Sequence, residues 1–332
     1  MITLGIESTA HTFGAGIIDC KNVKKRDARI LANERVAYTT EKGGMIPAEV
    51  ADHHANICDS IIKQSLKKAN IKLTDIDLIS YSQSPGLGHM LNIGAFVARS
   101  LARLLDIPLI GVNHCIAHLE IGRLLTDAKD PVLLYASGAN TQIIAYESGK
   151  YRIFGETLDI GIGNFLDSFA RHAGLGFPGG PKIYELSKKS NNYIELPYVV
   201  KGMDISLGGL LTNLKQKLNK GYKLEDLAYS LQETAFAMLL EVSERAMAHC
   251  QKTELLLGGG VACNERLKEM AKIMCKERGA KAFFLENQYN VDNGAMIAWQ
   301  GILEYDAGNR TKIREADIKP YLRTDDIDVN WR

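Results

Sequence analysis

One short pattern occurs twice in this chain, and it limits the possible folds more than any other feature of the sequence. Ile2–Glu7 is an apolar run that predicts a strand, and it is followed by the polar turn Ser8–Thr12 and the apolar run Gly14–Ile18. Residues 131–146 repeat this order, with apolar runs on both sides of Ser137–Thr141. Two such units about one domain apart indicate a duplicated fold.

The two polar turns are candidate phosphate-binding loops. Their small and hydroxyl-bearing residues let backbone N–H groups approach a phosphate closely. For the first copy taken alone, a plain hairpin turn is the favoured explanation. Two turns that face each other across a cleft would grip a phosphate chain from both sides, so the repetition favours the phosphate interpretation.

Predicted strands alternate with predicted helices along the rest of the chain. Helical patterns cover residues 47–70, 92–106, 165–173, 224–250 and 295–303, and buried strands cover residues 76–82, 107–112, 254–257 and 283–286. This alternation indicates an α/β architecture with a largely parallel sheet. We expect two lobes, residues 1–125 and residues 126–332, the second with inserted helices at about 160–250.

Two histidines form a candidate metal site. His114 and His118 follow the predicted strand 107–112, and Asn113 can cap a helix that begins there. Residues four apart lie on one face of a helix, so the two imidazoles can share a divalent ion. A polar helix start explains the pair as well. Asp292, before the last predicted helix, fits either an N-cap or a third metal ligand.

A glycine triplet marks a second candidate binding element. Gly258–Gly260 lies between a predicted strand and a predicted helix, and Asn264 follows at the start of that helix. Such a crevice accepts a nucleotide or its ribose, and the Asn264 amide offers both a donor and an acceptor. A bare tight turn is the alternative.

Composition restricts the partners and the compartment. Forty basic and thirty-nine acidic residues give a net charge of +1, so any RNA surface must be local or supplied by a partner. The six cysteines form no CxxC pair, which predicts reduced thiols. We find no signal peptide and no apolar run of membrane-spanning length, and we expect a cytoplasmic protein without membrane contact.

Several motifs together resemble one family. In chain order they occupy residues 114–118, 137–142, 155–159, 178–182, 258–264 and 292–296. Over roughly residues 2–322 the chain is similar to the catalytic subunit of the tRNA threonylcarbamoyl transferases, the TsaD-like family that includes the KEOPS type. The resemblance implies the duplicated fold of actin, sugar kinases and chaperone ATPases (ASKHA), with two lobes around a nucleotide cleft.

The resemblance also implies an activity and its components. The family transfers a threonylcarbamoyl group from threonylcarbamoyl-AMP to the adenosine next to the anticodon of tRNA and releases AMP. It implies one divalent metal per subunit, iron first and zinc second, with tRNA, a small kinase-like ATPase subunit and other KEOPS-type subunits as partners. The implied metal ligands are His114, His118, Asp292 and Tyr135. The implied contacts to an adenine nucleotide are Tyr135, Ala136, Ser137, Gly138, Ala139, Asp167, Gly180 and Asn264.

The chain departs from the family pattern at three places. Tyr184 stands where Glu is usual, Leu207-Gly208-Gly209 stands where Phe-Ser-Gly is common, and Ser84 and His89 flank a glycine loop of unusual sequence. The departure at Tyr184 affects a ribose contact that the resemblance implies, and the departure at residues 207–209 affects the packing beneath the cleft.

One catalytic candidate and three alternatives complete the analysis. Glu7, at the end of the first predicted strand, is a candidate for removing the proton of the attacking amine. An ATPase or phosphotransferase of the same fold is one alternative, and a non-catalytic nucleotide-gated module is another. A metallopeptidase is disfavoured, because Cys115 occupies the position of the general-base Glu that follows the first His.

Overall fold

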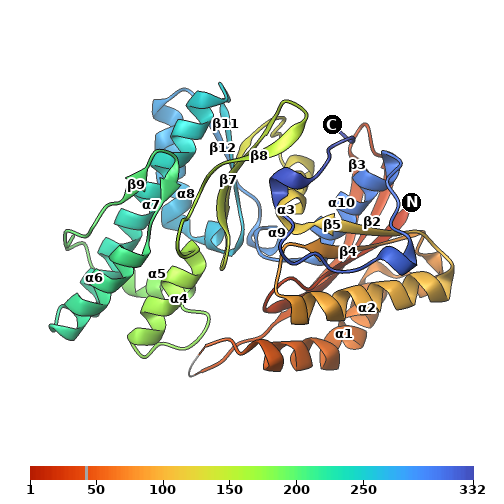
Figure 1. The fold of residues 1–332 in the computed structure, drawn as a ribbon, viewed down its shortest axis with the longest axis horizontal. Coiled ribbons are helices and arrows are strands. Elements are labelled where there is room, and N and C mark those ends of the chain that lie inside the picture. Colours follow the sequence, from red (N-terminus) through yellow and green to blue (C-terminus); the bar gives the residue numbers. More distant parts are fainter. Residues whose placement is uncertain (42–43) are drawn as a thin grey trace.

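The computed structural model describes residues 1–41 and 44–332 and contains two five-stranded sheets, one in each half of the molecule (Figure 1). The first sheet has the order β3-β2-β1-β4-β5, and the second has the order β12-β11-β6-β7-β8. The strands of the first sheet are β1 Ile2–Glu7, β2 Thr12–Asn22, β3 Asp27–Ala37, β4 Leu78–Ser84 and β5 Leu109–Asn113. Those of the second are β6 Val132–Ala136, β7 Thr141–Glu147, β8 Lys150–Glu156, β11 Glu254–Gly258 and β12 Lys281–Phe283.

The two sheets have the same topology. Each begins with a three-stranded antiparallel meander, β1-β2-β3 or β6-β7-β8, and then adds two parallel strands beside the first strand of the meander. The predicted duplicated α/β fold is therefore confirmed. The predicted largely parallel sheet is wrong for the meanders, because a short turn between neighbouring strands makes them antiparallel.

Ten α-helices surround the sheets in the described residues. They are α1 Pro47–Ala69, α2 Gly88–Leu105, α3 His114–Leu125, α4 Ile162–His172, α5 Gly180–Ser187, α6 Gly208–Asn219, α7 Leu224–His249, α8 Glu265–Glu277, α9 Asn287–Asn290 and α10 Gly294–Asp306. Helices α1 and α2 cover one face of the first sheet, and α3 and α10 cover the other. One face of the second sheet packs on α4, α7 and α8. A small hairpin, β9 Val200–Lys201 and β10 Asp204–Ile205, precedes α6.

Helix α3 lies between the two sheets and packs on both. Ala117 and Ile121 join the core beneath the first sheet, whereas Ile116 and Leu119 join the core of the second. All residues from His114 to Gly122 are buried. Any polar side chain on this helix is therefore held away from bulk water, which suits a preorganised site.

Helix α10 returns to the first sheet at the end of the chain, as the blue and red segments of Figure 1 show. A methyl group on Gly16 would overlap the backbone of Ala295, and a methyl group on Gly294 would overlap the backbone of Gly16. Glycine at these positions lets the start of α10 touch the strand backbone. The predicted second lobe, residues 126–332, thus includes a helix whose packing partners belong to the first sheet.

Several element boundaries differ from the predictions by one to four residues, including those of β12 and α2. Strand β12 ends at Phe283, whereas the predicted strand ran from 283 to 286, because its pairing with β11 covers only residues 281–283. Helix α2 begins at Gly88 rather than at 92, directly after the glycine loop. Within the described residues, no helix combines the length and the apolar character needed to span a membrane.

Candidate active site

The start of α3 fixes the two histidines. The Asn113 side chain caps the helix by accepting hydrogen bonds from the backbone N–H groups of Cys115 and Ile116 at 3.0 and 3.2 Å, as predicted. His114 and His118 then project from one face of the helix, with ring centroids 4.7 Å apart. Both side chains are buried, so the helix start presents two imidazoles toward the space between the lobes.

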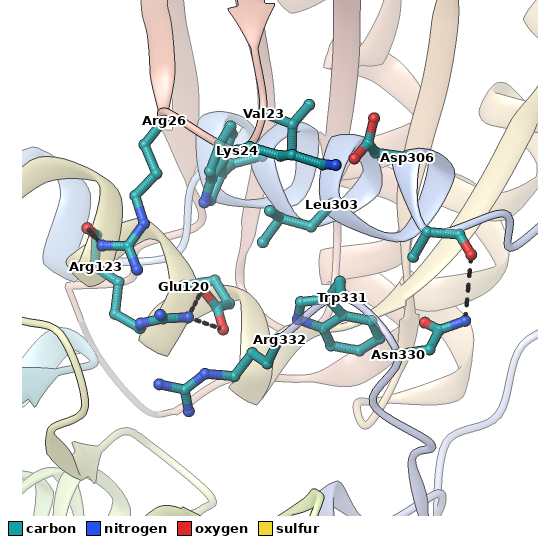
Figure 2. Close-up of a pocket in the computed structure, with 12 residues that line it drawn as sticks. Val23, Lys24, Arg26, Glu120, Arg123, Leu303, Asp306, Asn330, Trp331 and Arg332 are labelled. Carbon is teal, nitrogen blue, oxygen red and sulfur yellow. Dashed lines mark hydrogen bonds and ion pairs between the residues drawn. The ribbon is translucent and has the colours of Figure 1, made fainter.

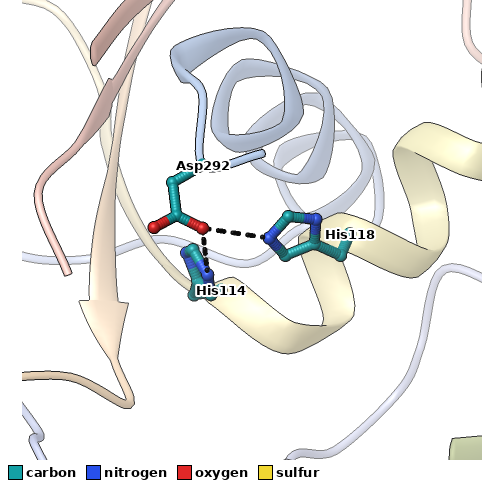
Figure 3. A group of neighbouring side chains, drawn as sticks. All are labelled: His114, His118 and Asp292. Atoms are coloured by element: carbon teal, nitrogen blue, oxygen red, sulfur yellow. Dashed lines mark ion pairs between the residues drawn. The ribbon is translucent and has the colours of Figure 1, made fainter. Parts of the chain in front are cut away.

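Asp292 completes a group of three side chains (Figure 3). Its Oδ1 lies 3.3 Å from Nε2 of His114 and 3.4 Å from Nε2 of His118. The N-cap of α10 is Asn293, whose side chain accepts a hydrogen bond from Met296 N, so Asp292 does not cap that helix. The position of Asp292 follows from the close docking of α10 on the first sheet.

The three side chains fit a divalent metal ion. Their potential ligand atoms all lie within 4.8 Å of one another, and the residues are buried. Metal–ligand bonds of about 2.0–2.2 Å place neighbouring donors about 3.0–3.4 Å apart, which agrees with the two distances from Asp292. Neither ring nitrogen of His118 makes a hydrogen bond to the described residues, and its Nε2 lies 3.4 Å from Oδ1 of Asp292. A buried, unpaired imidazole nitrogen beside a carboxylate suits a metal ligand.

Glu7 holds His114 from the opposite side. Its Oε2 lies 2.8 Å from Nδ1 of His114, and its Oε1 accepts hydrogen bonds from the backbone N–H and the hydroxyl of Thr9 at 2.7 and 2.5 Å. When Nδ1 carries the proton, Nε2 of His114 keeps its lone pair toward Asp292. Glu7 is fully buried, and both of its oxygens are engaged. The geometry therefore favours an orienting function for Glu7 over direct proton removal from a substrate.

The carboxylates and the histidines of this group shift one another's pKa values. Burial alone would lower the pKa of His114, but the carboxylates of Glu7 and Asp292 together raise it well above its ordinary value. Burial would raise the pKa of Asp292, yet the two histidines hold it well below its usual range. Burial lowers the pKa of His118, which favours its neutral imidazole. Metals bind neutral imidazoles and ionised carboxylates, so a metal ion here would displace the Nε2 proton that the raised pKa of His114 favours.

Tyr135 lies at the edge of the histidine group. Its hydroxyl is 3.0 Å from Nε2 of His114, and its ring packs 5.0 Å from the ring of His118. Burial raises the pKa of the Tyr135 phenol well above its ordinary value. The hydroxyl approaches the same nitrogen that faces Asp292, which is where a fourth ligand would have to lie.

A cavity of about 780 Å³ opens above this group between the two lobes. His114, Tyr135 and Asp292 line it together with parts of both polar turns, Thr9–His11 and Ser137–Asn140. The predicted meeting of the two turns across a cleft is thus observed. The size of the cavity suits a nucleotide-sized ligand.

The cavity contains some of the predicted nucleotide-binding residues but not all of them. Ser137, Gly138, Ala139 and Asp167 line it, in addition to Tyr135. The Asp167 carboxylate also accepts a hydrogen bond from Gly179 N at 2.7 Å at the start of α5, and burial raises its pKa.

Three other predicted residues lie outside the lining. Ala136 is buried in the core of the second lobe, and Gly180 is the first residue of α5. The Asn264 side chain caps α8 by accepting from Arg266 N and Leu267 N, and it donates to Gln232 at 2.5 Å. Both ends of this amide are therefore already used.

The residues that depart from the family pattern have local roles. Ser84 is buried beside the cap of α3, with its hydroxyl 3.4 Å from the amide nitrogen of Asn113. The carboxylate of Asp159 accepts from Leu207 N and Gly208 N at 2.9 and 2.8 Å, which fixes the start of α6. Tyr184, on α5, lies under the ammonium group of Lys188.

The sequence analysis missed one wall of the cavity. Residues 320–324 line it, although the sequence after residue 306 carries no strand or helix pattern. This segment crosses from the first lobe to the second. The only sign of it in the sequence was Pro320, which favours a turn. Arg171 also lines the cavity and was not predicted, whereas His11 was expected there only as part of the first polar turn.

A smaller cavity of about 340 Å³ lies away from the cleft (Figure 2). Glu120, one of its two acidic residues, accepts two hydrogen bonds of 2.8 Å from Arg123 and another from the hydroxyl of Tyr151. The lining also contains Asp306 and the basic residues Lys24, Arg26 and Arg332, so it is positively charged overall and Glu120 is already paired. The unpaired metal-binding groups lie instead in the larger cleft.

The chain is similar over most of its length to proteins of one family. Residues 29–299 match the family model described as TsaD, tRNA N6-adenosine threonylcarbamoyltransferase. Proteins of that name from Thermococcus sibiricus and Thermococcus kodakarensis are 53% identical over 332 residues, which cover both chains completely. A probable bifunctional tRNA threonylcarbamoyladenosine biosynthesis protein from Methanothermobacter thermautotrophicus is 50% identical over all of this chain and 61% of its own length.

Solved structures share the fold at low sequence identity. A HypF from T. kodakarensis superposes with a TM-score of 0.64 and 13% identity, over 91% of this chain and 47% of HypF. Component A of the Acidaminococcus fermentans (R)-2-hydroxyglutaryl-CoA dehydratase gives a TM-score of 0.58 and 18% identity, over 91% of this chain and 97% of that protein. These likenesses support the actin-like fold class and carry no information on the substrate.

Proposed function

The chain belongs to the TsaD family of tRNA N6-adenosine threonylcarbamoyltransferases, and from this premise we propose how its cleft carries out the transfer. The chain is a transferase that places a threonylcarbamoyl group on an adenosine of tRNA. We propose that the donor is threonylcarbamoyl-AMP, that the acceptor is the adenosine next to the anticodon, and that the reaction takes place in the cytoplasm, where tRNA is used.

The observation that carries this proposal is the group of His114, His118 and Asp292 at the base of the cleft. These side chains would hold one divalent metal ion, iron in the first place and zinc in the second, with Tyr135 as a fourth ligand. A bound cation supplies positive charge beside the phosphate that leaves with AMP. Glu7 keeps the proton of His114 on Nδ1, so that Nε2 stays available.

The two polar turns would bind the adenylate. Ser137, Gly138 and Ala139 on one side and Thr9 to His11 on the other approach the same cavity, and small residues let backbone groups contact a phosphate. Asp167 lies in the lining of the second lobe and would contact the nucleotide. The resemblance also implies nucleotide contacts for Ala136, Gly180 and Asn264. These residues would act at most through the packing around the cleft.

The chemistry is acyl transfer. The adenine N6 attacks the carbamoyl carbon, a C–N bond forms, and the C–O bond to the phosphate breaks, so that AMP leaves with the bonding electrons and the N6 proton passes to a base. Holding the weakly nucleophilic amine against the acyl carbon supplies much of the rate enhancement. The sequence suggested Glu7 as the base. Its engagement with His114 and Thr9 makes the phosphate of the leaving AMP the better proton acceptor.

Partner subunits would complete the tRNA site. A net charge of +1 supplies little of the counterion release that dominates binding to nucleic acids. Relatives called bifunctional match this chain over only about three fifths of their length, so a second activity lies on the same polypeptide there. We therefore propose a small kinase-like ATPase subunit and further KEOPS-type subunits as partners.

One reconstitution tests the proposal. The chain, with its partner subunits, is incubated with tRNA, threonylcarbamoyl-AMP and Fe²⁺, and the digested tRNA is analysed by mass spectrometry for threonylcarbamoyl adenosine. We expect the product with the wild-type chain and its loss with Asp292→Ala. Arg314→Ala, an exposed change on the tail, is the matched control. Equal product from Asp292→Ala after metal removal would contradict the metal-dependent mechanism.

A further inference from the structure

The C-terminal segment carries an exposed aromatic ring at the cleft. Residues 320–324 form one wall of the cavity that also contains His114 and Asp292. Tyr321 belongs to this wall, and 94% of its surface is exposed, the largest value among the exposed large apolar side chains of the described residues. A tyrosine whose ring is exposed at the mouth of an active site is available for contact with a ligand, because its ring is apolar and its hydroxyl is polar.

The backbone that carries Tyr321 is fixed to both lobes. Lys319 and Leu322 close a turn through a 3.1 Å hydrogen bond, and Pro320 occupies its second position, where its fixed φ is favourable. Tyr321 is the third residue of this turn and therefore stands at its tip.

Both ends of the turn are anchored. Lys319 N donates to Gln83 O at 2.9 Å, and Gly86 N donates to Pro320 O at 3.2 Å, which ties the turn to the first lobe. On the other side, the Arg323 guanidinium lies 3.3 Å from a carboxylate oxygen of Glu156 on β8. The backbone at the tip of the turn is thus anchored, so that little backbone ordering is needed when a ligand contacts the Tyr321 ring.

The chemistry of the substrate identifies the ligand. A base within a stacked RNA loop cannot bring its amine to the buried group at the cleft floor without leaving the stack. The base beside it then loses a stacking partner. An exposed aromatic face at the rim can replace that partner, since aromatic side chains stack on any base.

We propose that Tyr321 stacks on the tRNA base next to the target adenosine while that adenosine enters the cleft. This inference rests on the proposed function, because it needs an adenosine of tRNA as the acceptor. The neighbouring apolar residues Leu87 and Pro320 line the same cavity and extend the platform beside the ring. Tyr321 is a binding residue for the acceptor and takes no part in the chemistry of the donor.

The test compares Tyr321→Ala, Tyr321→Trp and the matched control Tyr222→Ala, whose ring is also exposed but lies at the α6–α7 turn. Each variant is assayed with its partner subunits for KM and kcat toward a tRNA transcript. Tyr321→Ala should raise the KM for tRNA about 10-fold or more, with kcat unchanged because stacking contributes to binding alone. Tyr321→Trp and Tyr222→Ala should retain the wild-type KM.

A second measurement does not depend on turnover. The added fluorescence of Tyr321→Trp, relative to the wild-type chain, should be quenched by tRNA and unaffected by AMP. The dependence of tRNA affinity on salt should have the same slope in Tyr321→Ala and wild type, since stacking releases no counterions. Quenching without any transfer would contradict the proposed function while showing that Tyr321 contacts tRNA, whereas transfer without quenching would contradict the stacking alone.

Three results would overturn the inference. The first is an unchanged KM for tRNA in Tyr321→Ala while transfer proceeds. The second is full activity of Tyr321→Leu, because a leucine side chain cannot stack on a base. The third is a loss of activity in Tyr321→Ala that disappears when a partner subunit is added in excess. The last result would assign the ring to a protein contact. Equal melting temperatures of all variants would show that an exposed substitution leaves the fold intact.

Discussion

The exchange of Glu7 for glutamine distinguishes two candidate functions of this residue, the orientation of His114 and the removal of the proton from the attacking amine. In the wild-type chain the carboxylate accepts from Thr9 through one oxygen and faces Nδ1 of His114 at 2.8 Å through the other. Glutamine keeps the shape and the Thr9 contacts, but it presents an NH₂ group to Nδ1. His114 must then accept at Nδ1 and carry its proton on Nε2, the atom that lies 3.3 Å from Asp292. A protonated Nε2 has no lone pair for a metal.

The expected effect follows from the loss of an outer-shell partner. Such changes weaken metal binding about 10- to 100-fold, which corresponds to about 1.4–2.7 kcal/mol. Titration of the metal-free variant with Zn²⁺ against a chromophoric chelator measures this directly and needs no substrate. Glu34→Gln on β3 is the control, since that carboxylate pairs with Lys68 and should leave the affinity unchanged.

One result would refute this reasoning. If Glu7→Gln bound Zn²⁺ as tightly as the wild type while transfer slowed, the tautomer argument would fail and Glu7 would act on the proton of the amine. Unchanged affinity together with unchanged turnover would exclude both functions.

Three further predictions concern the site and the fold. Asp292→Asn keeps an oxygen but removes the charge, so the same titration should show a loss beyond the 10- to 100-fold of an outer-shell change. Gly16→Ala places a methyl group against the backbone of Ala295 and should lower the free energy of unfolding by about 1–3 kcal/mol in denaturant titrations. Burial raises the pKa of Glu304 to about 7 from 4.5, so the folded chain keeps a proton that the unfolded chain releases as the pH rises. Stability should therefore fall by at most about 3 kcal/mol between pH 4.5 and 7, and Glu304→Gln should melt higher than wild type at pH 8 but not at pH 4.

The sequence predicted those parts of the molecule that local patterns determine. The duplicated hairpins and the cap at Asn113 follow from residues close together in the chain, and the structure contains both. The third strand of each meander was missed, because β3 and β8 are partly exposed strands without a clear apolar run.

The functions of single polar residues were harder to predict. A cap and a ligand use the same side chains, so Asp292 and Asn264 each allowed two interpretations. The structure shows Asn264 as a cap and Asp292 beside His118, a contact that depends on how α10 docks. Glu7 resembled a free base because the sequence gives no sign of His114 above it. The wall at residues 320–324 has no periodic pattern, and only its three-dimensional anchoring reveals it.

The return of α10 to the first sheet has a consequence for the synthesis of the protein. The apolar face of the first sheet that this helix covers, which includes Ile18, Leu78 and Ile110, is not covered by α10 until residues 294–306 have left the ribosome. A nascent chain that ends after the first lobe therefore cannot bury that surface, and Asp292 joins the histidines in the same event. During synthesis, the first core and the candidate metal centre are therefore completed together. A truncated chain that lacks α10 has neither a complete first core nor a complete metal centre.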